Sequence, residues 1–212
     1  MSLRCLYFTL VMAACCADID SATAFDPALN SRYFPIDAEV CEWANEELAA
    51  TREPALPTAG KEAARAGTES YCFTWLRSFN NPVVVRAVHD RNGTRRIVTK
   101  MMDRDEKGRS RDLVIDKSKT LNEQQWAGLV ERVQASEFWA QPTKEQPQFV
   151  LPNGNRHVLA KVDGAHWVFE AATANGFHVV DRHNPPQDSK FADLCLYLLE
   201  LSDIDLSKEK VY

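Results

Sequence analysis

Four runs of β-branched and aromatic residues, separated by turn-forming residues, occupy the middle of the chain. Such residues favour strands because their side chains pack well on a pleated surface. The second and third runs are joined at Asn92-Gly93, and both of these residues accept the positive φ angles that a tight hairpin requires. The sequence therefore predicts a four-stranded antiparallel meander with strands over 71–79, 82–89, 95–103 and 111–117.

A helix is predicted directly after the meander, because the spacing of apolar residues changes there from two to about 3.6. Thr120-Leu121-Asn122-Glu123 matches a capping box, in which the Thr hydroxyl and the Glu carboxylate each bond an unpaired backbone N–H. The apolar stripe behind this box contains Trp126, Leu129, Val130 and Val133. A final helix is predicted over 189–202, with a buried stripe of Phe191, Leu194, Cys195, Leu198 and Leu201.

Between these two helices, three shorter runs predict strands near 156–162, 165–172 and 176–182. A meander followed by a helix thus occurs twice, and a duplicated β-sheet-plus-helix unit is one explanation. The predicted class is α+β, an antiparallel sheet with helices packed on one face. Residues 70–212 would form this single domain. Residues 25–69 precede it as a helix over 36–50 followed by a loop.

The first 24 residues predict export. Arg4 precedes an apolar run, 6–16, which has the length of a signal-peptide core and is too short to span a bilayer. Ala22-Thr23-Ala24 has the small-x-small pattern that a leader peptidase recognises. Cleavage there would leave a periplasmic or secreted protein that begins at Phe25.

Two alternatives to this cleavage stay open. Residues 1–14 could instead be a lipoprotein signal, because Met12-Ala13-Ala14-Cys15 resembles the lipoprotein motif with Met where Leu is usual. Cys15 would then carry the lipid that anchors the protein to the envelope. The other alternative is an uncleaved N-terminal helix in a cytosolic protein.

Three cysteines remain if the chain is cut after Ala24. Cys195 belongs to the apolar stripe of the last predicted helix, so it is expected to be a buried thiol. Cys41 and Cys72 are then the predicted disulfide in an oxidising compartment. Closing that loop would contribute about 3–4 kcal/mol of stability. No Cys/His spacing predicts a metal site, and no cofactor motif is present.

Positive charge is concentrated in one part of the chain. Residues 86–119 hold eleven Lys or Arg and six Asp or Glu, whereas the whole chain has a net charge of −5. Arg95, Arg96 and Arg109 are the predicted binding residues of this stretch, for an acidic protein or another anionic component of the envelope. Nucleic acid is not expected, because no aromatic residues are interleaved with these cations. The competing interpretation is a solvated hairpin of mixed charge.

The candidate catalytic residues are Glu170, His178 and Asp181, in the last predicted hairpin. A turn of residues 173–175 would place Glu170 opposite His178, and a tight turn at Asn175-Gly176 would place it opposite Asp181. A carboxylate beside a histidine orients the ring and favours its charged form, as an acid–base pair requires. The competing interpretation is a cross-strand polar pair on a solvated sheet face.

Several segments together resemble a family of uncharacterised exported proteins from Gram-negative bacteria. They are Tyr71–Phe79, Ser136–Trp139, Trp167–Glu170 and Phe177–Arg182, and the resemblance covers residues 70–200. It implies export but no activity, so no site residue is carried over from it.

The sequence is compatible with three functions. The leading hypothesis is a non-enzymatic binding protein of the periplasm, such as an inhibitor or immunity protein for an envelope enzyme or toxin. The second is a hydrolase of envelope polymers that uses Glu170, His178 and Asp181. The third is a structural or accessory lipoprotein anchored through Cys15, and this anchor would be the protein's only contact with a membrane.

Overall fold

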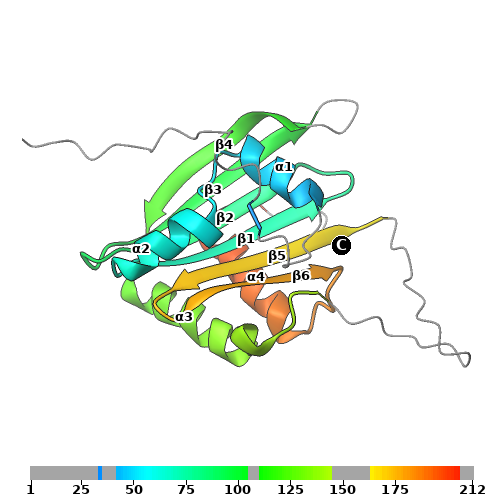
Figure 1. Cartoon of the computed structure of the whole chain (residues 1–212). Coiled ribbons are helices and arrows are strands. Elements are labelled where there is room, and N and C mark those ends of the chain that lie inside the picture. Colours follow the sequence, from blue (N-terminus) through cyan, green and yellow to red (C-terminus); the bar gives the residue numbers. More distant parts are fainter. Residues whose placement is uncertain (1–32, 35–41, 105–109, 145–162, 206–212) are drawn as a thin grey trace, which may run out of the picture.

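The computed structural model describes residues 33–34, 42–104, 110–144 and 163–205. These residues form one six-stranded antiparallel sheet in the order β4-β3-β2-β1-β5-β6, with helices on both sides (Figure 1). The strands are β1 (Glu69–Arg77), β2 (Val83–His89), β3 (Arg95–Arg104), β4 (Ser110–Thr120), β5 (Ala165–Thr173) and β6 (Gly176–His183). The helices are α1 (Glu42–Ala50), η2 (Leu56–Gly60), α2 (Lys61–Arg65), α3 (Glu123–Ala135), η3 (Phe138–Ala140) and α4 (Lys190–Leu201).

The predicted α+β class and the predicted meander are confirmed. Strands β1 to β4 follow one another in the sheet, and the β5–β6 hairpin pairs with the other edge of β1. The two predicted meanders therefore belong to a single sheet rather than to two separate units. The additional strand predicted over 156–162 lies outside the described residues.

The two faces of the sheet carry different cores, because successive side chains of a strand point to opposite faces. On what we call the helical face, Phe73 and Trp75 of β1 pack in one cluster with α3 and α4. On the N-terminal face, Cys72 and Leu76 pack with residues that precede β1. These preceding residues, the N-terminal segment, include Tyr33, Phe34, Ala44, Leu48 and Leu56.

The expected packing of helices on one face thus holds for α3 and α4, whereas α1 and α2 lie on the other side of the sheet (Figure 1). Helix α1 is the described part of the helix predicted over 36–50, since residues 35–41 are outside the described ranges. Within the described ranges, no helix is long and apolar enough to cross a membrane.

Helix α4 matches its prediction. Ser189 is its N-cap and accepts a hydrogen bond from the Ala192 amide at 3.1 Å. Phe191, Leu194, Leu198 and Leu201 are buried, and so is the free thiol of Cys195, whose pKa is raised well above its ordinary value by burial.

The start of α3 differs from the prediction. Thr120 is the last residue of β4, where it pairs with Arg96, and the next amide, that of Leu121, donates to the Arg95 carbonyl at 2.8 Å. The capping box forms two residues later. Asn122 Oδ1 accepts from the Gln125 amide at 2.8 Å, and Gln125 Oε1 accepts from the Asn122 amide at 3.0 Å. Strand pairing therefore decides where this helix begins.

We expect Asn122→Ala to lower the free energy of unfolding by about 1 kcal/mol, because it leaves the first turn of α3 without its cap. Thr120→Ala is the matched control, since Thr120 is exposed and caps nothing. Urea denaturation of both variants measures the difference. A larger loss in Thr120→Ala would place the cap at the position that the sequence predicted.

Candidate functional site

The predicted catalytic residues are not brought together. Glu170 pairs with Val179 and His178 pairs with Ala171, because the hairpin turns at Ala174-Asn175. Both predicted registers, with Glu170 opposite His178 or Asp181, are wrong. Compared with the register that placed Glu170 opposite His178, the observed pairing is shifted by one residue. A shift of one residue moves the side chains of a strand to the other face of the sheet. Glu170 therefore lies on the N-terminal face and His178 on the helical face.

His178 has a structural partner. Its Nε2 donates to the Gln141 carbonyl at 2.9 Å, and its ring meets Phe138 edge-on with centroids 4.9 Å apart. These contacts attach η3 and the residues after it to β6.

Asp181 pairs with a different histidine from the one predicted. Its Oδ1 lies 2.9 Å from His166 Nδ1, and the carboxylate is 4 % exposed. His166 pairs in register with His183, and Asp181 pairs with Val168, so the two partners are diagonal neighbours on the N-terminal face. Among the described residues, no group of three His, Cys, Asp or Glu side chains could hold a metal ion.

Glu170 is inaccessible to a substrate. It is 2 % exposed, stands between Cys72 of β1 and Val179 of β6, and its Oε1 has no hydrogen-bond partner within the described structure. Burial, reinforced by the charge of Glu53, raises the pKa of Glu170 well above its ordinary value. The environment of this side chain, inside the core of the N-terminal face, therefore favours its neutral form.

Three cations of the basic stretch have acidic partners in the N-terminal segment. Glu53, 2 % exposed, lies 2.5 Å from Arg86 Nε and 2.8 Å from Lys100 Nζ. Burial alone would raise the pKa of Glu53, but the two cations outweigh it and lower the pKa. Arg104 Nη2 lies 3.1 Å from Glu47 of α1. Three sheet cations therefore hold two carboxylates of the N-terminal segment.

Further hydrogen bonds fix this segment at Thr51, at Glu53 and at Tyr33-Phe34. Lys100 Nζ also donates to the Thr51 carbonyl at 3.0 Å, just after α1, where the helix dipole favours a cation. The Tyr33 hydroxyl donates to the Glu53 carbonyl at 2.7 Å. Asn45 Oδ1 accepts from the backbone amides of both Tyr33 and Phe34.

The predicted binding arginines do not form one surface. Arg95 and Arg96 are consecutive in β3, so their side chains lie on opposite faces of the sheet. Arg109 lies outside the described residues. Lys117 and Lys119, farther along the basic stretch, both bind Asp203 after α4. The role of Arg95, Arg96 and Arg109 in binding an acidic partner stays a prediction.

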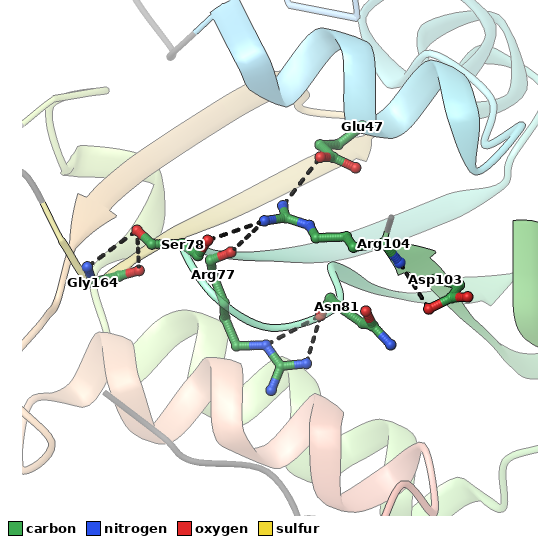
Figure 2. Close-up of polar contacts among 7 residues, drawn as sticks. All are labelled: Glu47, Arg77, Ser78, Asn81, Asp103, Arg104 and Gly164. Carbon is green, nitrogen blue, oxygen red and sulfur yellow. Dashed lines mark hydrogen bonds and ion pairs between the residues drawn. The ribbon is translucent and has the colours of Figure 1, made fainter. Parts of the chain in front are cut away.

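The turn between β1 and β2 is held by two arginines (Figure 2). Arg104 Nη1 donates to the carbonyls of Arg77 and Ser78, at 2.9 and 3.3 Å. The Arg77 guanidinium reaches back across the turn to the Asn81 carbonyl, with Nη2 at 2.5 Å and Nε at 3.2 Å. Guanidinium groups donate several hydrogen bonds from a planar frame, so each bond limits the direction of the others.

The same turn is attached to the start of β5. The Ser78 amide and hydroxyl both donate to the Gly164 carbonyl, at 2.9 and 3.0 Å, and the Gly164 amide donates back to Ser78 Oγ at 3.2 Å. Gly164 has a φ of 134°, and a Cβ there would lie 2.2 Å from the Asn184 amide nitrogen. Asn184 Oδ1 in turn accepts from the Ala165 amide at 2.7 Å. Only glycine fits between these groups.

The tip of this turn displays an aromatic side chain. Phe79 is 72 % exposed, more than the other exposed large apolar residues of the described chain, Val114 and Trp139. The exposure of Phe79 was not predicted from the sequence, because the predicted strand ran to this residue and implied a packed side chain. The signal that was present is a single aromatic residue inside the polar turn sequence Ser78-Phe79-Asn80-Asn81.

The sequence also predicted a disulfide between Cys41 and Cys72. Cys72 is a buried free thiol in the structure, and Cys41 lies outside the described residues.

The chain matches no protein-family model and no curated protein.

We expect Glu53→Gln to lower the free energy of unfolding by about 3–5 kcal/mol, because it leaves two sheet cations without their carboxylate. The folded-state pKa of Glu53 is lowered, so its contribution is present above the ordinary value of 4.5 and is lost as pH falls through the folded pKa. Denaturant unfolding at pH 7 and pH 3 measures both effects. Glu62→Gln, on the exposed side of α2, is the control, and equal losses in the two variants would contradict the role of Glu53.

Glu170→Gln should have the opposite effect at neutral pH. The pKa of Glu170 is raised in the folded state, so the wild type loses stability as pH rises above 4.5, where only the unfolded chain ionises. Glutamine has no such loss. We therefore expect the difference between the Tm of Glu170→Gln and the Tm of the wild type to be larger, in favour of the variant, at pH 7 than at pH 4. The exposed control Glu131→Gln should show no such change, and a pH-independent difference at position 170 would mean that Glu170 is ionised when folded.

Proposed function

We propose that this protein is an exported, non-enzymatic binding protein of the bacterial envelope, which associates with another protein in the manner of an inhibitor or an immunity protein. The observation that carries the proposal is Phe79, an exposed aromatic ring on a turn that is tied to two neighbouring strands.

Such a ring is suited to binding because the backbone on either side of it, at Ser78 and Asn81, is held by hydrogen bonds before any partner arrives. An aromatic side chain buries about 150–250 Å² when it enters a pocket. A turn that is already ordered loses little conformational entropy on association, so more of this burial is available as affinity. Residues that dominate interfaces are commonly aromatic side chains of this kind.

The hydrolase hypothesis has weaker support. It requires Glu170, His178 and Asp181 to converge on one pocket, and the hairpin register directs His178 to the other face. Glu170 is also buried and Asp181 is paired with His166. A binding function requires none of these groups to reach a substrate.

The proposed export rests on the leader sequence and on the resemblance to exported Gram-negative proteins. Either cleavage after Ala24 or a lipid on Cys15 would deliver the domain to the envelope. In an oxidising compartment we also propose the Cys41–Cys72 disulfide. Cys41 precedes the buried residues Ala44 and Leu48 by three and seven residues, which is the spacing of one helix face, and both of these pack in the same cluster as Cys72.

The test is photo-crosslinking in the intact envelope, with a benzoylphenylalanine in place of Phe79. We expect one adduct of discrete mass, because the ring would lie inside the partner. The same group in place of Val114, another exposed apolar residue, is the matched control. Adducts at neither position, or equally at both, would contradict the proposal.

The variant Phe79→Ser separates binding from folding. An exposed side chain contributes little to stability, so its free energy of unfolding should stay within about 0.5 kcal/mol of the wild type. The adduct formed through a second photoreactive group, placed at Asn80, should disappear in this background. The intact mass of the same purified protein reports the cleavage site, any lipid and any disulfide.

A further inference from the structure

Asp163 lies on one side of the Phe79 tip. The ladder between β1 and β5 continues past Arg77 and Ala165, because Ser78 bonds the Gly164 backbone. In the same antiparallel register, the residue opposite Phe79 is Asp163, which is exposed. Its carbonyl accepts from the Asn184 side-chain amide at 3.5 Å, so this flank of the tip is also held in place.

Asp103 lies on the other side of the tip. The Met102 amide donates to the Pro82 carbonyl at 3.1 Å, which brings the end of β3 beside the end of the turn. Asp103 follows Met102, is exposed, and accepts from the Arg104 amide at 2.8 Å (Figure 2). The backbone of Asp103 therefore lies near the end of the turn, and its carboxylate accepts a hydrogen bond from the next amide.

Two exposed carboxylates flank this turn. Among the described residues, neither Asp103 nor Asp163 forms an ion pair, whereas Arg104 pairs with Glu47 at 3.1 Å and the Arg77 guanidinium is directed to the Asn81 carbonyl. Within the described structure, the turn that carries Phe79 therefore stands between two exposed carboxylates without an ion-pair partner.

We infer that the partner is a protein with an apolar pocket that takes the Phe79 ring. The rim of this pocket carries Lys or Arg side chains that face Asp103 and Asp163. This inference rests on the proposed binding function. Complementary rim charges guide association and set the orientation in which the two surfaces meet. An anionic lipid surface would be repelled by the same two carboxylates. The inferred partner thus has the opposite charge to the one predicted from residues 86–119.

The chemistry of the pocket can be tested with a displayed library of random peptides. The immobilised mature protein is the target, and the Phe79→Ser variant is used for counter-selection. We expect the selected peptides to combine aromatic or aliphatic residues with Lys or Arg. Their affinity should fall about three- to tenfold in the double variant Asp103→Asn, Asp163→Asn, and should weaken as salt is added. The double variant Asp112→Asn, Asp116→Asn removes two exposed carboxylates of β4 and is the matched control.

Acidic or uncharged peptides, an unchanged affinity in the Asp103/Asp163 variant, or no Phe79-dependent selection would each overturn the inference. Binding of the protein to phosphatidylglycerol vesicles through Phe79 would overturn it as well. An envelope adduct at position 79 that persists after Asp103→Lys and Asp163→Lys would overturn the charged rim while leaving the binding function intact. Absence of that adduct contradicts the binding function itself, independently of the peptides.

Discussion

The contact of Glu53 with Arg86 and Lys100 is the interaction on which the rest of the structure depends. A sheet with two apolar faces needs cover on both, and α3 and α4 cover only one. The second face is covered by the N-terminal segment, whose helices α1, η2 and α2 are short, and the buried carboxylate fixes this segment in position over β2 and β3. Because a buried ion pair is costly to break by removing one member, this contact also opposes other placements of the segment.

The distribution of charge along the chain follows from this arrangement. The basic stretch and the acidic N-terminal segment are separate in sequence and adjacent in space, so several cations of residues 86–119 are paired with acidic residues of the same molecule. Among the described residues near the β1–β2 turn, the exposed charges without an ion-pair partner are the carboxylates of Asp103 and Asp163. A local count of charges along a sequence therefore did not report the charge of a surface, because folding paired the cations with residues up to 86 positions away.

The sequence predicted those features that depend on near neighbours. The meander, helix α4 and the buried Cys195 follow from spacing and turn residues, and all three were confirmed. The start of α3 was misplaced because strand pairing of Thr120 competed with an equally good capping pattern. The register of the β5–β6 hairpin was missed because three adjacent turn positions were acceptable, and the site proposed for Glu170 and His178 failed with it. Phe79 could not be found by pattern, since its exposure is set by Arg104, Ser78 and Gly164, which come from three different strands or their ends.

The attachment of the β1–β2 turn has a mechanical consequence. Ser78 is bonded toward β3 through Arg104 and toward β5 through Gly164, so the turn belongs to the central part of the sheet and not to one hairpin. A pull on Phe79 along the strands would load in shear the two ladders that flank this hairpin, β1–β5 and β2–β3, and many hydrogen bonds would have to break together. A hairpin loop attached on one side only would instead peel open one bond at a time. The turn that displays Phe79 is thus anchored to the sheet on both of its sides.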